Sequence, residues 1–145
     1  MGRARRRIQF LGRFVGLEYL MMDTPAFKAL SGNEVKLLLL LCRKHNGENN
    51  GQIGCSVREG AAFLGCTANT AGRCFCGLQE RGFAVIMSKG AFSVKHRKAT
   101  LWRLTFYPSL GGKPATRDYA RWHPNEANAK KQRTVSPEDT HSITG

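Results

Sequence analysis

The stretch 56–82 (SVREGAAFLGCTANTAGRCFCGLQERG) constrains the fold more than any other part of this 145-residue chain. Ser56 and Glu59 have the spacing of a capping box, in which the two side chains satisfy backbone N–H groups at the start of a helix. Gly65 is suited to end that helix, because glycine readily adopts the left-handed conformation found just beyond helix C-termini. A second helix is expected over about 68–81, so this stretch predicts two short helices joined by a tight turn.

The second of these helices has one apolar and one polar face. Thr67 precedes it and is a good N-cap residue. The residues expected to face the core, at three- and four-residue spacing, are Ala71, Cys74, Phe75 and Leu78. The residues on or near the opposite face are Asn69, Thr70, Arg73, Cys76 and Glu80. A solvent-facing helix that opens with Thr, Asn, Thr and Arg suits the DNA major groove, where arginine can bind guanine with two hydrogen bonds.

The charge of the chain is consistent with a polyanionic partner. Its formal net charge is +13 and its pI about 10.2, a range typical of proteins that bind nucleic acids. A solvated basic surface without a partner is the alternative. No acidic residue occurs between Glu80 and Asp118. The basic residues in that interval are Arg81, Lys89, Lys95, Arg97, Lys98, Arg103, Lys113 and Arg117.

Two strands are expected directly after the helical stretch. Residues 83–88 (FAVIMS) resemble a strand, and residues 99–106 (ATLWRLTF) alternate between apolar and polar positions. The connecting residues form a basic loop that carries Lys89, Lys95, Arg97 and Lys98. Such a hairpin predicts a wing that contacts the nucleic-acid backbone, although an ordinary exposed hairpin is also consistent with the pattern.

The N-terminal part combines a basic arm with helical segments. Residues 1–13 are rich in arginine, including Arg5, Arg6 and Arg7, and are expected to be disordered in the free protein and able to lie along phosphates or in a minor groove. Residues 14–22 are expected to form a strand or a packing segment, and residues 24–30 a short helix that begins at a proline.

A longer helix is expected over residues 32–44. Ser31 and Glu34 form a second capping box before it. Leucines 37–41 surround its axis, which predicts that the helix is covered on two sides. One cover is the pair of short helices in residues 56–82, a helix-turn-helix, and the other is either the segment 14–30 or a second subunit. A homodimer is therefore left open.

The remaining segments are turns and a tail. Residues 45–51 (HNGENNG) predict a turn, and residues 52–54 a short strand. From residue 108 onward apolar residues become sparse, so residues 108–145 are expected to be mostly disordered, with Tyr119 and Trp122 as a small docking spot.

Several other classes of protein fit the sequence poorly. The longest apolar run is too short to cross a bilayer and no signal peptide is evident, so a cytoplasmic protein without a membrane partner is expected. The five cysteines do not suggest a disulfide framework. Cys74 and Cys76 would project about 200° apart around one helix, which does not suit a single zinc ion. No nucleophile motif or phosphate loop is present, so we expect no catalytic site, no cofactor and no small-molecule ligand.

This order of elements resembles the winged helix-turn-helix family, and more closely the small helix-turn-helix proteins of proteobacterial genomes and mobile elements. The segments that carry the resemblance are LMMDTPAFKALS, HNGENNGQI, SVREGAAFLGCTANTAGRCFCGLQERGF and KGAFSVKHRKATLWRLT. The resemblance covers residues 14–107 and implies an α+β fold, with a three-helix core and a β-hairpin wing, between a disordered basic arm and a disordered tail.

The resemblance also implies duplex DNA as the partner, with the 68–81 helix in the major groove and base or phosphate contacts from Thr67, Asn69, Thr70 and Arg73. Transcription regulation is the leading role. Plasmid or phage replication is the alternative, and a winged helix used for protein–protein contacts is a third interpretation.

The sequence departs from this pattern at three helical glycines. Gly60, Gly72 and Gly77 stand where alanine or a longer residue is expected. Each glycine is expected to cost about 1 kcal/mol of stability relative to alanine.

Overall fold

The computed structural model describes residues 12–93 and 96–126, which form an α+β domain. The helices in chain order are α1 (Tyr19–Met22), α2 (Pro25–Lys28), α3 (Gly32–Lys44), α4 (Val57–Leu64) and α5 (Ala68–Glu80), followed by the 3₁₀ turns η1 (Leu110–Gly112) and η2 (Asp118–Arg121). The strands are β1 (Ile53–Gly54), β2 (Ala84–Ser88), β3 (Ala91–Ser93), β4 (His96–Lys98) and β5 (Leu101–Leu104). The predictions for residues 1–11, 94–95 and 127–145 concern residues outside the described ranges.

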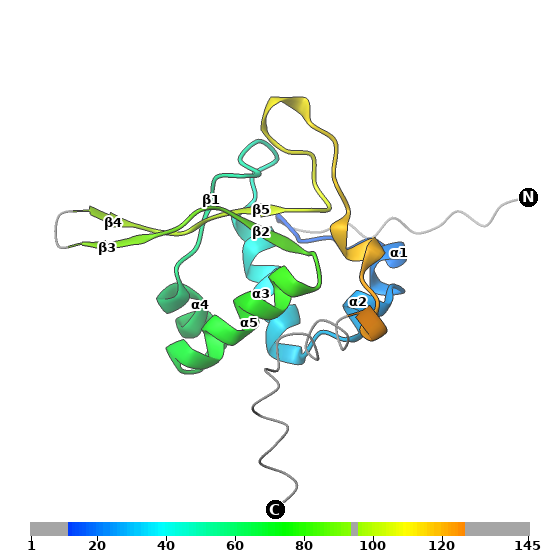
Figure 1. Ribbon diagram of the computed structural model, residues 1–145. Coiled ribbons are helices and arrows are strands. Elements are labelled where there is room, and N and C mark those ends of the chain that lie inside the picture. The colour runs from blue at the N-terminus through cyan, green and yellow to red at the C-terminus, as the bar shows by residue number, and fades with distance from the viewer. Residues whose placement is uncertain (1–11, 94–95, 127–145) are drawn as a thin grey trace, which may run out of the picture.

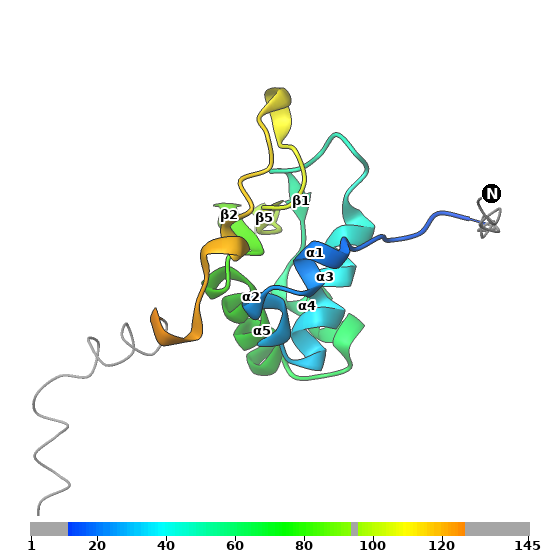
Figure 2. The same cartoon turned by 90° about the vertical axis from the view of Figure 1, so that its right-hand side faces the viewer.

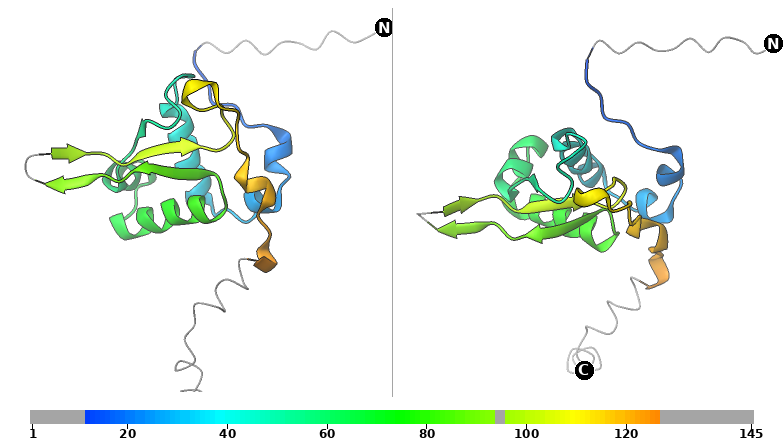
Figure 3. Two further views of the ribbon diagram at one scale, coloured as in Figure 1. Left: turned by 45° about the horizontal axis from the view of Figure 1, so that its top comes forward. Right: turned by 90° about the horizontal axis from the view of Figure 1, so that it is seen from above.

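An antiparallel sheet lies across helices α3, α4 and α5 (Figures 1 and 2). Its strand order is β1-β5-β2, so the central strand β5 pairs with both of the others. Strands β3 and β4 continue β2 and β5 as a separate antiparallel pair, the distal hairpin, which projects away from the helices (Figure 3). The arrangement is compatible with the winged helix-turn-helix expected from the sequence.

The distal hairpin differs in one respect from the expected basic loop. Residues 89–99 were expected to connect two strands as a loop, whereas β3 and β4 pair from Ala91 with Lys98 to Ser93 with His96. The register of β2 against β5 shifts between Ile86 and Ser88. A bulge of this kind bends a ladder and increases its twist, which accounts for a break between the inner sheet and the distal hairpin.

The predicted pair of short helices is confirmed at α4 and α5. The Ser56 hydroxyl oxygen accepts the Glu59 backbone N–H at 3.1 Å, while the Glu59 carboxylate is paired with Lys44. Gly65 ends α4 at φ 69°, in the left-handed region that favours glycine. Thr67 caps α5 by accepting the backbone N–H of Thr70 at 3.2 Å. The caps predicted from residue type therefore fix both ends of the turn.

The leucines of α3 are covered within this chain. Leu37, Leu38, Leu40 and Leu41 are buried, and Leu39 is half-buried. The helix packs against α4, α5 and β1, and residues of α1 and α2 join the same core. A second subunit is therefore not needed to account for the leucine-rich helix.

Aromatic side chains connect the helices to the sheet. The Phe75 ring on α5 stacks on the Trp102 ring of β5, with 4.8 Å between centroids. The Trp102 indole N–H donates to the Cys55 carbonyl at 3.0 Å, so this buried aromatic residue has a partner for its polar group. These contacts hold α5 at a fixed position against the sheet and leave its opposite face exposed.

The C-terminal part of the domain differs from the expectation that residues 108–145 are mostly disordered. Tyr119 is buried, and its ring stacks on Phe83 with 5.1 Å between centroids. The segment approaches so closely that a Cβ added to Gly82, which has φ 82°, would lie 2.7 Å from the Asp118 carbonyl carbon. The folded domain therefore extends beyond residue 107, to at least Trp122, which packs against the core. Tyr119 and Trp122, predicted from the sequence as a small docking spot, both pack against the core.

The three helical glycines have different surroundings. A Cβ on Gly60 would lie 2.8 Å from Phe75 Cε2, and a Cβ on Gly77 would overlap with the Glu34 carboxylate. At these two positions glycine permits close packing between helices, which corrects the expectation that they only reduce stability. Gly72 has no atom within 4 Å of such a Cβ, so there the expected cost of glycine stays a prediction.

We predict opposite effects for two alanine substitutions in these helices. Gly72→Ala should raise the free energy of unfolding by about 0.5–1 kcal/mol, because alanine is the better helix former and has room. Gly60→Ala should lower it by about 1 kcal/mol, because crowding against the Phe75 ring outweighs the same gain. Urea unfolding of both variants measures the difference. Equal shifts in one direction would contradict the packing role of Gly60.

Candidate nucleic-acid interface

The outward face of α5 presents polar side chains at its N-terminal end. Asn69 and Arg73 are exposed, one helical turn apart, and Thr70 is half-buried beside them. The Thr67 hydroxyl donates to Thr70 Oγ1 at 3.1 Å in addition to capping the helix. Thr67 is therefore engaged within the helix, while the hydroxyl proton of Thr70 remains available to an acceptor outside it. The expected exposure of Asn69 and Arg73 is confirmed.

The distal hairpin and the residue before it supply cations. Lys89 and Lys98 are exposed at its base. Arg97 lies on β4, where its backbone pairs with Phe92. Lys95 and the arm residues Arg5, Arg6 and Arg7 lie outside the described residues.

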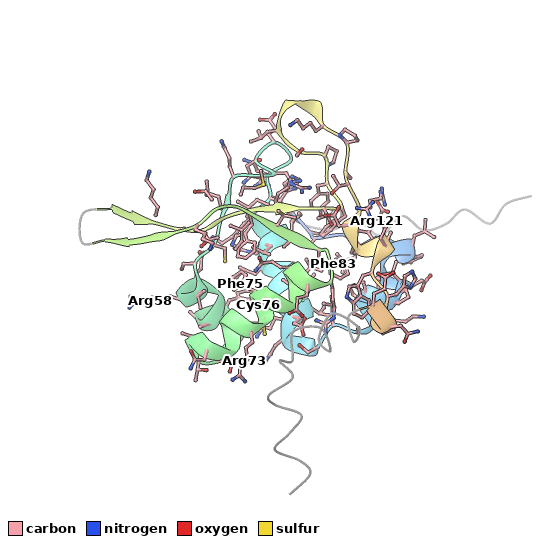
Figure 4. All side chains as sticks on the ribbon, viewed as in Figure 1. Arg58, Arg73, Phe75, Cys76, Phe83 and Arg121 are labelled. Atoms are coloured by element: carbon pink, nitrogen blue, oxygen red, sulfur yellow. The ribbon has the colours of Figure 1, made fainter. Side chains whose placement is uncertain are left out.

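The hairpin and the N-terminal half of α5 lie on the same side of the molecule (Figures 1 and 3). In Figure 4, Arg73 extends from the lower edge of α5, and Arg58 extends from α4 between Arg73 and the hairpin. Arg58 is exposed and was not among the expected contact residues. No local feature of the sequence distinguished Arg58, because its place on this side depends on how α4 packs beside α5. Arg73, Arg58 and the cationic distal hairpin therefore lie in that order along one side of the domain.

Ion pairs neutralise charge elsewhere on the described surface. Arg81 binds Glu34 at 2.7 Å, Arg117 binds Glu18 at 3.2 Å, and Lys44 is paired with Glu59. A further pair joins Arg121 to Asp118 within η2. These pairs engage half of the carboxylates in residues 12–93 and 96–126, and none of them involves Arg73, Lys89 or Lys98. Uncompensated positive charge therefore remains on α5 and at the hairpin.

The outer face of α5 changes character along its length. An open depression of about 770 Å³ follows it, lined by Asn69 and Arg73 at one end and by Glu34, Glu80 and Arg81 at the other. The Glu34 carboxylate is held by Arg81, whereas Glu80 is exposed. An anionic ligand would therefore be attracted to the first two turns of α5, where the helix dipole also favours negative charge.

The described cysteines are mostly packing residues. Burial raises the pKa of the Cys42 thiol to about 12 and that of Cys55 to about 11, and it also raises the pKa of Cys74. These three side chains are therefore protonated at neutral pH, which does not suit a metal-binding or nucleophilic thiolate. Cys76 is exposed on the same face as Arg73. Within the described part of the chain, no group of three or more His, Cys, Asp or Glu side chains could hold a metal ion.

Comparison with protein-family models, with curated proteins and with solved structures found no match for this chain. None of the helices in the described ranges is long and apolar enough to cross a membrane.

Proposed function

We propose that this protein is a winged helix-turn-helix that binds duplex DNA, with α5 in the major groove and the distal hairpin as a wing on the backbone. The observation that carries the proposal is the exposed Asn69–Arg73 face of α5 on the same side as the cationic hairpin. An α-helix fits the major groove, and paired Arg and Asn side chains there can read guanine and adenine edges.

The proposed contacts divide into base readout and backbone binding. Arg73 and Asn69 read base edges. Thr70 donates its hydroxyl to a phosphate at the N-terminal end of α5, where Thr67 completes the cap. Lys89, Lys98 and Arg97 neutralise phosphates along the wing, and Arg58 does so from α4. Backbone contacts fix the position of the protein on the duplex, while the base contacts select the sequence.

The biological role that we propose is transcription regulation, and replication of a mobile element is the second candidate. Selection of genomic fragments by the purified full-length chain at physiological salt distinguishes them. Enrichment of promoter regions supports regulation, and enrichment of a single origin supports replication. Retention of no fragment above a non-binding control protein would contradict DNA binding itself.

The wing contact predicts a change in salt dependence. Replacing both Lys89 and Lys98 by Ala should weaken binding to all duplex sequences and reduce the slope of log affinity against log salt by about 0.9 per lost contact. The slope is measured by fluorescence anisotropy over a salt series, with one specific and one unrelated duplex.

The matched control removes the same charge from two elements outside α5 and the distal hairpin. Lys28 is the last residue of α2 and Lys113 follows η1, and both are exposed. The double variant Lys28→Ala, Lys113→Ala should retain the wild-type slope. If the two double variants have equal slopes, the hairpin lysines do not touch the phosphates.

A further inference from the structure

Gly72 lies in the interior of α5, where glycine destabilises a helix relative to alanine. Packing explains the other two glycines inside α4 and α5. A Cβ on Gly77 would overlap with the Glu34 carboxylate, and one on Gly60 would lie 2.8 Å from Phe75 Cε2. A Cβ on Gly72 would have no atom of another element within 4 Å in the described ranges. The folded domain therefore supplies no reason for glycine at this position.

The surroundings of Gly72 point to a role outside the fold. Asn69, Gly72, Arg73 and Cys76 line one open depression of about 770 Å³ on the outer face of α5. Because the side chains of a helix tilt toward its N-terminus, a side chain at position 72 would extend toward Asn69. Its absence leaves the outer face of α5 hollow beside the two residues proposed to read bases.

The two proposed base-reading side chains differ in length. Arg73 is long enough to reach a base edge from some distance, whereas Asn69 is short. Asparagine recognises adenine with two hydrogen bonds, and each bond requires the donor and acceptor to lie about 3 Å apart. Both side chains can make their contacts together only if the backbone of α5 lies close to the base edges. Glycine permits such close approach of a backbone to a ligand.

We propose that Gly72 is a specificity-determining residue, which lets α5 enter the major groove deeply enough for Asn69 to bind an adenine. This inference rests on the proposed function and adds the base that Asn69 selects. A methyl group at position 72 would hold α5 away from the base edges. The bonds of Asn69 would be lost first, because the longer Arg73 can still reach its guanine.

Gly72→Ala separates stability from recognition. The variant should resist urea better than the wild type does, because alanine is the better helix former. It should nevertheless bind the selected duplex roughly fivefold or more weakly, which is the lower end of the value of one bidentate base contact. The duplex is first selected from a random pool by the wild-type chain. Fluorescence anisotropy with single base changes in that duplex should show a reduced preference for adenine and a retained preference for guanine.

A double-mutant cycle with Asn69→Ala tests whether Gly72 acts through that side chain. In the Asn69→Ala background, Gly72→Ala should have little further effect, because the contact that it displaces is already gone. In a Lys89→Ala background the two losses should add, since Lys89 is proposed to bind phosphate independently. Gly32→Ala is the control. Gly32 begins α3, does not line the depression, and has the same open space for a Cβ, so this variant should bind as the wild type does.

Undiminished affinity of Gly72→Ala for the selected duplex would overturn the inference, since the hollow would then serve no contact. Equal losses in the wild-type and Asn69→Ala backgrounds would also overturn it, as would a loss of guanine preference alone. In each of these cases the wild-type chain still selects a duplex, so the proposed function stands. A wild-type chain that selects no duplex contradicts the proposed function, and this inference fails with it.

Discussion

Asn50→Ala is expected to destabilise the domain by about 3–4 kcal/mol, the largest effect of any single substitution considered. Asn50 is only 1% exposed. Its side-chain oxygen accepts the Leu104 backbone N–H at 2.7 Å, and its amide donates to the carbonyls of Leu104, Tyr107 and Pro108 at 2.8, 3.0 and 3.2 Å. Alanine would leave the buried N–H and carbonyl of Leu104 without these partners and would remove two partly buried bonds, to Tyr107 and Pro108. Equilibrium unfolding in urea measures the cost.

A neighbouring asparagine provides the control. Asn49 donates to the Lys44 carbonyl and accepts the Asn46 backbone N–H, in a half-buried turn open to water. Asn49→Ala should therefore cost only about 1 kcal/mol, since water can replace both bonds. If the two alanine variants lose the same stability, Asn50 does not hold the end of β5 as described.

In the variant Asn50→Asp, the free energy of unfolding should depend on pH in a way that tests the bonds from the Asn50 amide to the three carbonyls. An ionised aspartate could still accept the Leu104 N–H, but its second oxygen would face carbonyl oxygens. The pKa of this carboxyl would be raised in the folded state, because the neutral form can still donate. The variant should thus be most destabilised relative to wild type at pH 7 and less so as the pH falls toward about 4, the ordinary range of aspartate.

Arg73→Ala is the substitution with the largest expected effect on DNA binding. If Arg73 reads a guanine, its loss should cost about 1–3 kcal/mol on the preferred site, or roughly 5- to 150-fold in affinity. Binding to unrelated duplexes should change much less, so the sequence preference relaxes. Selection from a random duplex pool, followed by titration of the selected site, measures both quantities.

Two further variants separate charge from geometry at this position. Arg73→Lys keeps the charge but cannot form the planar two-bond contact, so it should retain most of the salt slope while losing sequence preference. Arg43→Ala removes an exposed arginine from the last turn of α3 and should leave affinity nearly unchanged. An unaltered preference in Arg73→Ala would remove this residue from the base-reading role.

Much of the local structure was predictable because it depends on neighbouring residues. Capping side chains at Ser31, Ser56 and Thr67 set the starts of α3, α4 and α5, and Gly65 set the end of α4. The spacing of apolar residues separated the buried face of α5 from the exposed face that carries Asn69 and Arg73. Capping and apolar spacing depend on residues only a few positions apart, so both can be recognised in the sequence.

Contacts between distant segments were not predictable in this way. Tyr119 was expected to dock, but its partner Phe83 lies far away in sequence and was not predicted. Likewise, Gly60 and Gly77 resembled weak helix positions until the helices that cross them were in place. Arg58 was likewise not predicted as part of the candidate site. It lies on the side of α5 and the hairpin only because α4 packs beside them.

The sequence by itself determined where α2, α3, α4 and α5 begin, which face of α5 is polar, and the large excess of positive charge. It did not determine α1, a helix within residues 14–22, where a strand or a packing segment was expected. Caps, periodicity and charge are local or additive properties of a chain. Only the tertiary structure decided how far the domain extends, which carboxylates neutralise which cations, and that apolar residues of α1 remain exposed. Whether a side chain is buried, and which charge it pairs with, depends on which distant segments pack together. That packing is set by contacts along the whole chain, so no short stretch of sequence indicates it.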